Sequence, residues 1–249
     1  MSGHSKWASI KHKKGAADAK RGKLFSKLAR AIIVAARDGG GDPDGNPTLA
    51  TAIQKARDAS MPKDNIQRAI DRGTGASGDA EAIEHVLFEG YGPGGAAILV
   101  DALTDNRNRT TADVRLAFTK HNGNLGEPGS VAWIFEKRGV VVVDGSRYGE
   151  DDLLMAIDAG AEDVREDDDL LRVISAPGSL SAVREALENS GVEIQSADVI
   201  VEPKSTVEVK GSDAKSLLNL IEALEEHDDV SEVHANFDIP EEILESAIA

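Results

Sequence analysis

The apolar residues of this chain follow a helical period up to about residue 73, and strand-like runs begin only after about residue 83. Glycine and proline divide the first part. Gly39–Gly41 ends one segment, Asn46 and Pro47 are the N-cap and first helical residue of the next, and Pro62 begins a third. We therefore predict a bundle of three amphipathic helices. It occupies residues 1–78 and ends in the small, polar stretch 74–80, where we place a domain boundary.

Each predicted helix has one apolar face directed at the core of the bundle. The predicted core residues are Leu24, Phe25, Leu28, Ala31, Ile32 and Ala35 in the helix 16–38, Leu49, Ala52, Ile53 and Ala56 in the second helix, and Ile66, Ala69 and Ile70 in the third.

The rest of the chain alternates strands and helices. Strand-like runs at 85–91 and 96–103 flank a Gly-Pro-Gly-Gly turn and predict a hairpin, which a helix at 109–121 and a strand at 130–136 follow. Residues 139–203 have the order strand, helix, strand, strand, helix, strand, which is typical of a ferredoxin-like unit. A strand at 205–209, a helix at 214–226, a strand at 230–237 and a short terminal helix complete the chain.

Neither 79–136 nor 204–249 contains enough elements for a complete domain. We therefore predict that they pack together as one discontinuous α+β domain, with the ferredoxin-like domain 137–203 inserted between them. Two consecutive domains without an insertion are the alternative. The fold class is α+β and multidomain.

Charge is distributed very unevenly along the chain. Residues 1–78 contain 15 Lys or Arg and 7 Asp, a net charge of +8, whereas the whole chain has a net charge of −16 and residues 79–249 therefore one of −24. Such asymmetry is typical of a protein whose basic part binds a polyanion. Solvated faces without a partner are the alternative interpretation.

The basic residues of the first helix form a stripe. At 100° per residue, Lys20, Lys23, Lys27, Arg30 and Arg37 fall within an arc of about 100°. A stripe of this kind can follow a phosphate backbone, so it favours nucleic acid as the polyanion.

The segment before this helix combines an aromatic residue with cations. Trp7 lies among Lys6, Lys11, His12 and the pair Lys13-Lys14. An aromatic beside cations holds unpaired bases by stacking and phosphates by charge. Trp7 can equally anchor the arm by packing on the bundle, and the sequence leaves both roles open.

Signals of enzymatic chemistry are lacking in the sequence. There is no cysteine, the six histidines show no zinc spacing, and two glycine-rich matches lack the strand-to-helix context of a dinucleotide site. We predict no catalytic residue, metal, cofactor or small-molecule substrate. Neither a secretory signal nor an apolar run of about 18 residues is present, so we expect no membrane contact and a cytoplasmic location.

Several longer strings resemble the YebC/PmpR family, which includes the mitochondrial translational activator of cytochrome c oxidase subunit I. They are GHSKWASIKHKK at 3–14, DAKRGKLFSKLAR at 18–30, EGYGPGGAAILVDALTDNRNRT at 89–110 and GNLGEPGSVAWIFEKRG at 123–139. The resemblance extends over essentially the whole chain. It implies three domains with an N-terminal helical bundle, and it supports the insertion.

The resemblance also implies a role in gene expression, for which the family has been described in two ways. We expect a non-enzymatic, ribosome- or rRNA-associated factor that eases translation of difficult sequences such as proline runs, because the acidic body would be repelled from a bare duplex. A DNA-binding transcriptional regulator is the alternative. The expected nucleic-acid contacts are Lys6, Trp7, Lys11, His12, Lys13, Lys14, Lys20, Arg21, Lys23, Lys27 and Arg30, with a second contact loop at Asn122, Gly123, Asn124, Leu125, Gly126 and Ser130.

Overall fold

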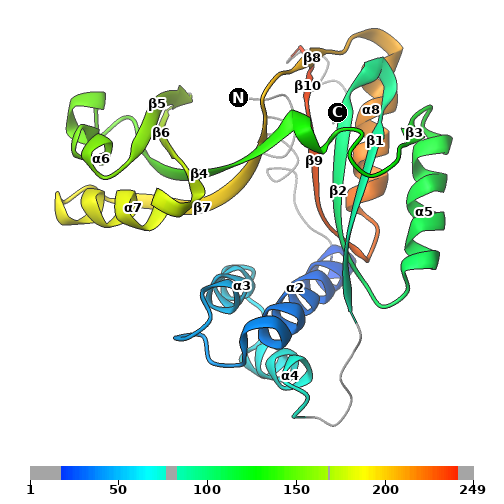
Figure 1. Cartoon of the computed structure of the whole chain (residues 1–249), viewed down its shortest axis with the longest axis horizontal. Helices are drawn as coiled ribbons and strands as arrows, with labels where there is room; N and C mark the ends of the chain where they lie inside the picture. The colour runs from blue at the N-terminus through cyan, green and yellow to red at the C-terminus, as the bar shows by residue number, and fades with distance from the viewer. Residues whose placement is uncertain (1–17, 77–82, 168, 241–249) are drawn as a thin grey trace. The chain divides into compact units, whose positions relative to one another are not determined.

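The computed structural model describes residues 18–76, 83–167 and 169–240 (Figure 1). It forms two compact units: residues 133–206 make one, and the described residues before 133 and after 206 make the other. The predicted α+β architecture is confirmed, with an N-terminal helical bundle, a discontinuous α+β domain and an inserted ferredoxin-like domain. The exact domain boundaries stay predictions, and the one at residue 78 lies outside the described residues.

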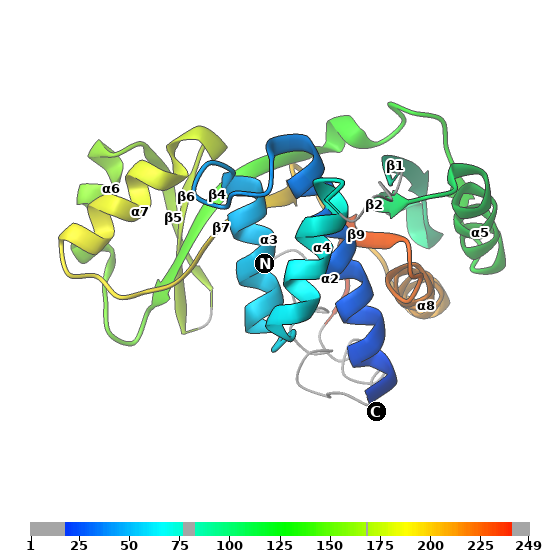
Figure 2. The ribbon, with the colours of Figure 1, turned by 90° about the horizontal axis from the view of Figure 1, so that it is seen from below.

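The bundle consists of α2 (Asp18–Gly39), α3 (Pro47–Asp58) and α4 (Lys63–Gly73), which Figure 2 shows packed together. The predicted cap at Asn46 is confirmed, because its side chain accepts a hydrogen bond from the Leu49 amide at 3.1 Å. The same side chain donates to the Ala35 carbonyl of α2 at 2.8 Å. One buried asparagine thus starts α3 and fixes it against α2.

The core of the bundle is shifted around α2 relative to the prediction. Ile32 and Ala35 are buried as expected, and Ile33 and Ala36 are buried as well. Leu24, predicted to face inward, is 45% exposed. It lies at the edge of the apolar arc of α2, and neighbouring elements cover the side of the helix that carries Ile33 and Ala36.

A close helix crossing explains this shift. A Cβ atom at Gly73 of α4 would lie 2.4 Å from the Ile33 carbonyl oxygen and 2.8 Å from the Ala36 Cβ. Only glycine permits the backbones of α2 and α4 to approach so closely.

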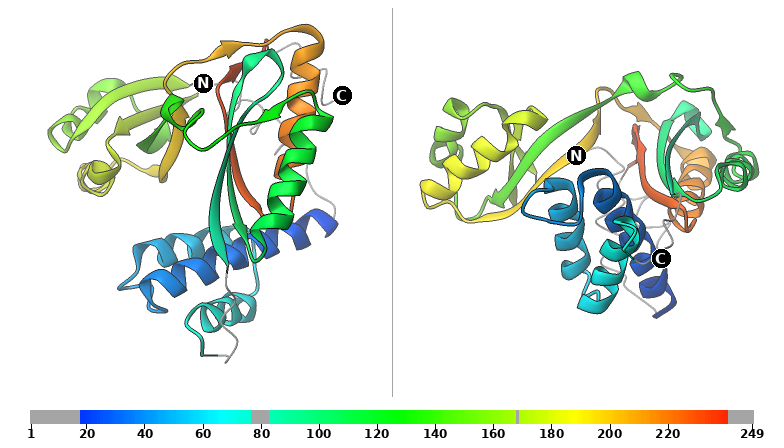
Figure 3. Two further views of the ribbon diagram at one scale, coloured as in Figure 1. Left: turned by 45° about the vertical axis from the view of Figure 1, so that its right-hand side comes forward. Right: turned by 60° about the horizontal axis from the view of Figure 1, so that its bottom comes forward.

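The discontinuous domain is a four-stranded sheet in the order β3-β1-β2-β9, with antiparallel neighbours. Figures 1 and 3 show α5 and α8 on one face of this sheet. Their side chains form the core with the inward residues of β1, β2 and β9. Because β2 and β9 come from opposite sides of the insertion, the sheet itself joins the two segments. The elements are β1 (Glu84–Tyr91), β2 (Ala97–Thr104), α5 (Arg107–Lys120), β3 (Asn124–Leu125), α8 (Gly211–Glu225) and β9 (Val230–Ala235).

Two strand predictions are confirmed only in part around this sheet. The segment 205–209 contributes only β8 (Val207–Glu208), which pairs in parallel with β10 (Phe237–Asp238) outside the main sheet. The segment 130–136 is mostly not a strand, because a 3-10 turn spans Ala132–Ile134 and the next strand begins at Phe135. The amides of Val131 and Ala132 bind a carboxylate, Glu89, in place of a neighbouring strand.

The inserted unit has the predicted ferredoxin-like topology. Its sheet has the order β5-β6-β4-β7, and every neighbouring pair is antiparallel. Val141, Val173 and Leu187 form its core with residues of the helices. The predicted helix at 151–158 is shorter, as a 3-10 turn at Glu150–Leu153 precedes a single α-turn. The elements are β4 (Phe135–Asp144), α6 (Met155–Asp158), β5 (Ala161–Asp167), β6 (Leu170–Ser175), α7 (Leu180–Asn189) and β7 (Ile194–Pro203).

Candidate nucleic-acid interface

Part of the predicted interface lies outside the described residues. This part includes the arm residues Lys6, Trp7, Lys11, His12, Lys13 and Lys14. Lys20 lies in the first turn of α2, where only the backbone is described. Their contacts with nucleic acid stay predictions.

Three residues of the basic stripe face the end of α8 in this structure, whereas Arg37 binds the Asp38 carboxylate and the Ile83 carbonyl. Lys23 Nζ donates to the Glu226 carbonyl at 3.3 Å. Lys27 donates to the Glu225 carbonyl, and Arg30 donates to the Asp228 carbonyl. Three residues that we predicted to bind phosphate therefore bind the chain's own backbone.

The end of α8 resembles a polyanion locally. The last carbonyls of a helix have no partner within the helix, and its dipole favours cations there. Glu225, Glu226, Asp228 and Asp229 add four carboxylates to the same short stretch. The spacing along α2 predicts one basic face correctly, but it does not show that the fold supplies acceptors for that face.

The Asp229 carboxylate is the centre of this contact. It is 3% exposed, lies 3.3 Å from a guanidinium nitrogen of Arg30, and accepts hydrogen bonds of 2.7 Å from both Arg109 and Thr110. Burial raises the pKa of Asp229, but the hydrogen bonds from Arg109 and Thr110 and the charges of Arg30 and Arg109 outweigh it, so the pKa lies below its ordinary value. One carboxylate thus joins α2 to α5.

Arg21 lies outside the stripe and differs from Lys23, Lys27 and Arg30. It is exposed, and within residues 18–76, 83–167 and 169–240 its guanidinium makes no hydrogen bond or ion pair. Arg21 lies one turn before Phe25, on the side of α2 that faces α4. It remains available to an external anion.

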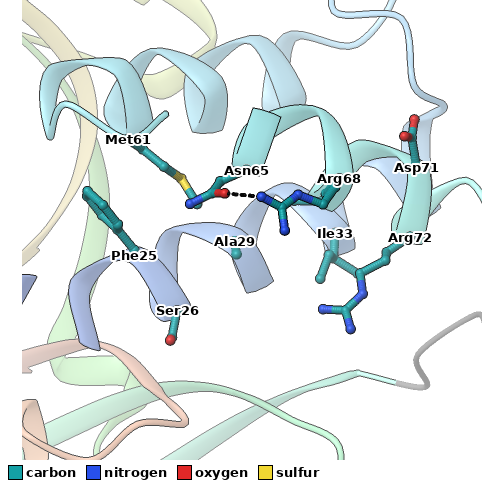
Figure 4. Close-up of a pocket in the computed structure, with 10 residues that line it drawn as sticks. Phe25, Ser26, Ala29, Ile33, Met61, Asn65, Arg68, Asp71 and Arg72 are labelled. Carbon is teal, nitrogen blue, oxygen red and sulfur yellow. Dashed lines mark hydrogen bonds between the residues drawn. The ribbon is translucent and has the colours of Figure 1, made fainter. Parts of the chain in front are cut away.

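A groove runs between α2 and α4. Its volume is about 510 Å³, and its apolar side chains come from both helices (Figure 4). Arg68 and Arg72 of α4 are exposed along it. The sequence analysis missed this feature because it assigned the basic face of α2 alone and treated α4 only as part of the core. The lining residues are Phe25, Ser26, Ala29, Ile33, Met61, Asn65, Arg68, Ala69, Asp71 and Arg72.

The predicted second contact loop follows α5. Asn122 adopts a φ of 61°, and Asn124 and Leu125 form β3 against β1. A Cβ atom at Gly123 would lie 2.9 Å from the Tyr91 carbonyl oxygen, so glycine is required there. Gly126 donates to the Glu89 carbonyl at 2.7 Å. The first half of the loop is therefore part of the sheet.

Glu89 holds the second half of the loop. Its buried carboxylate accepts hydrogen bonds from the amides of Gly129, Val131 and Ala132 at 2.7, 2.8 and 2.7 Å. Burial raises the pKa of Glu89, but these three bonds outweigh it and the pKa lies below its ordinary value. These amides bind Glu89 rather than a phosphate. Contact with nucleic acid at Ser130 and the exposed positions of the loop stays a prediction.

Comparison with known proteins identifies the family. The model of the TACO1/YebC N-terminal domain matches residues 5–76, and the model of the TACO1/YebC second and third domains matches residues 83–237. The chain belongs to the TACO1/YebC family. The predicted resemblance is therefore confirmed over nearly its whole length.

Relatives match nearly the entire chain. A protein from Rubrobacter xylanophilus is 58% identical over 98% of both chains, and one from Dictyoglomus turgidum is 55% identical over 99% of both. Both carry the name "probable transcriptional regulatory protein", which is not the name of an enzyme. A crystal structure is known for a conserved hypothetical protein from Aquifex aeolicus, whose sequence is 50% identical to this one. The two structures match with a TM-score of 0.77 over 91% of this chain and 94% of that one.

The described part of the chain contains neither a membrane-crossing helix nor a cluster of metal ligands. None of the helices described is both long and apolar enough to cross a membrane. No cluster of three or more His, Asp or Glu suited to a metal ion occurs within that part of the chain.

Proposed function

We propose that this TACO1/YebC protein is a non-enzymatic regulator of gene expression that binds nucleic acid through its N-terminal module. The observation that carries the proposal is the concentration of positive charge in residues 1–78, next to an acidic remainder. Within the bundle, Arg21 of α2 and Arg68 and Arg72 of α4 are exposed. Exposed cations supply the salt-dependent part of nucleic-acid affinity.

The names of the relatives favour DNA as the partner. Two relatives are named probable transcriptional regulatory proteins, and identity above 50% over 98–99% of the chain supports the same role here. This role was the alternative in our sequence analysis. It predicts a footprint at defined sites that survives moderate salt, since base contacts outlast phosphate contacts.

Ribosomal RNA remains the second candidate, and the charge distribution favours it. Residues 79–249 have a net charge of −24, and the end of α8 covers Lys23, Lys27 and Arg30. Both features weaken the attraction of the protein to an extended duplex. They leave a compact basic region that suits a cleft of the ribosome. This role predicts altered ribosome pausing at difficult sequences in cells that lack the protein.

One paired experiment separates the two roles. Promoter footprinting and co-sedimentation with ribosomes are measured across the same salt series, with the wild type and with the double variant Lys13→Gln/Lys14→Gln. The double variant Lys120→Gln/Lys215→Gln is the matched control, because it removes the same charge at two exposed positions outside the bundle. Binding in neither assay would contradict the proposed function, and retention of binding by the arm variant would exclude the arm from it.

A further inference from the structure

The groove between α2 and α4 combines an apolar surface with a cationic edge. The side chains of Phe25, Ala29 and Met61 form the apolar surface. Figure 4 shows the Phe25 ring and the Met61 thioether at one end of the groove. The guanidinium of Arg68 is held along α4 by hydrogen bonds to Asn65 Oδ1 at 2.7 Å and to the Asp64 carbonyl at 3.2 Å. Arginine has five N–H donors, so further donors remain for a ligand.

This combination fits a nucleotide. A flat base stacks on an aromatic or thioether surface, while the attached phosphate binds a guanidinium in bidentate geometry. The volume of about 510 Å³ lies in the range of small-ligand sites. Asp71 also lines the groove, but its carboxylate accepts a hydrogen bond from Gln67 and points away from Arg72 in Figure 4.

Gly22 is a second, independent observation. It lies inside α2, one turn before Ser26, and among the described residues nothing comes within 4 Å of the position that a Cβ atom would occupy. Glycine inside a helix lowers stability relative to alanine, so its presence requires a reason. Within residues 18–76, 83–167 and 169–240, no close packing supplies that reason. A strand that passes over α2 at this point does, because the missing side chain lets it approach the helix backbone.

The positive charge along the edge of the groove indicates which molecule can bind there. The N-terminal arm carries Lys6, Lys11, Lys13 and Lys14, which Arg68 and Arg72 would repel. A base in a DNA duplex is paired and stacked, and a few kcal/mol are needed to free it. RNA loops present unstacked bases without that cost.

We propose that the α2–α4 groove binds an unpaired base of single-stranded RNA, which stacks at Phe25 while its phosphate binds Arg68. This inference rests on the proposed nucleic-acid function and assigns it a site. It places the strand across Gly22 and beside Arg21. The groove is thus distinct from the α8-bound face of the same helix.

The test measures binding of the full-length protein to a 12-nucleotide RNA that carries one 2-aminopurine. Loss of the ring in Phe25→Leu should weaken binding roughly 5- to 150-fold, the range for one stacked base, and should abolish the change in 2-aminopurine fluorescence. Arg68→Gln should weaken binding and lower the salt slope by about one. Gly22→Leu should weaken binding by occupying the path of the strand.

The matched control for Arg68→Gln is Arg57→Gln, which removes the same charge from an exposed position of α3 outside the groove. Circular dichroism and urea midpoints show whether each variant is folded, and Gly22→Ala adds a variant that should fold more stably and still bind less tightly. If RNA binds the wild type but the groove variants bind like Arg57→Gln, the groove assignment is wrong and the proposed function stands. If no RNA or DNA binds the wild type, the proposed function itself fails.

The same oligonucleotide as single-stranded DNA, the corresponding duplex and an acidic peptide are the remaining probes. RNA should bind most tightly, and the duplex should be insensitive to Phe25→Leu. Tighter binding of single-stranded DNA or of the peptide, with the same sensitivity to Phe25→Leu and Arg68→Gln, would replace RNA as the occupant and overturn the proposal.

Discussion

The Asp229 carboxylate lies 3.3 Å from the guanidinium of Arg30, so a buried acid after α8 holds a cation that the sequence suggested for nucleic acid. Arg109 and Thr110 of α5 bind the same carboxylate at 2.7 Å. The contact joins the bundle to the sheet domain within one compact unit. It is the first target for mutation.

Asp229→Asn should lower the free energy of unfolding by about 3–5 kcal/mol, since it leaves two arginines without their buried partner. Urea denaturation monitored by circular dichroism measures the change. Asp228→Asn is the control, because Asp228 is exposed and binds Arg30 only through its backbone carbonyl. Equal stability of the two variants would show that the Asp229 side chain does not join the domains.

The same carboxylate should make stability depend on pH in acid. Its folded-state pKa lies below the unfolded value of about 3.9, so its stabilisation is fully present above about pH 4 and is lost as the pH falls through the folded pKa. Urea midpoints between pH 2 and pH 7 measure this effect. The wild type should lose stability more steeply in acid than Asp229→Asn, and parallel curves would contradict the assignment.

Glu89→Gln should loosen the loop that ends the sheet domain. Glutamine keeps the shape, but one amide oxygen cannot replace a carboxylate that accepts from Gly129, Val131 and Ala132. We expect a loss of about 2–3 kcal/mol of stability and faster hydrogen exchange at these three amides. Glu84→Gln, at an exposed position of the same strand, should leave the exchange unchanged.

Two glycine substitutions should have opposite effects on the bundle. Gly73→Ala places a Cβ 2.4 Å from the Ile33 carbonyl and should lower the free energy of unfolding by about 1–3 kcal/mol. Gly22→Ala meets nothing within 4 Å among the described residues and should raise it by about 0.5–1 kcal/mol. Thermal melts of both variants test the contrast, and a loss of stability in Gly22→Ala would show that the helix needs glycine for a packing reason.

The two halves of the predicted basic site should separate in experiment. Changing Lys23, Lys27 and Arg30 to Gln should lower stability by about 1–3 kcal/mol, because each donates to a carbonyl at the end of α8. Changing Lys13 and Lys14 to Gln should leave the urea midpoint within about 0.5 kcal/mol of wild type and weaken nucleic-acid binding. If the triple variant is as stable as the wild type, these residues belong to the nucleic-acid-binding surface and not to the contact with the end of α8.

The sequence alone determined most of the element types, because period, caps and breakers act locally. Asn46, Pro47 and Gly39–Gly41 set the ends of the helices as predicted, and the β-α-β-β-α-β order of residues 139–203 led to the observed ferredoxin-like sheet. It also determined that the positive charge lies in the first 78 residues and on one face of the first helix.

Only the tertiary structure decided what that face touches. Lys27 and Glu225 are 198 residues apart, and no local pattern states that the end of α8 supplies acceptors for the α2 cations. The same holds for Val131 and Ala132, which the sequence predicted to lie in a strand. Their amides instead donate to the carboxylate of Glu89, 42 and 43 positions earlier. Hydrogen-bond partners distant in the chain are chosen by packing, so the sequence located the charge and the fold determined which cations remain exposed.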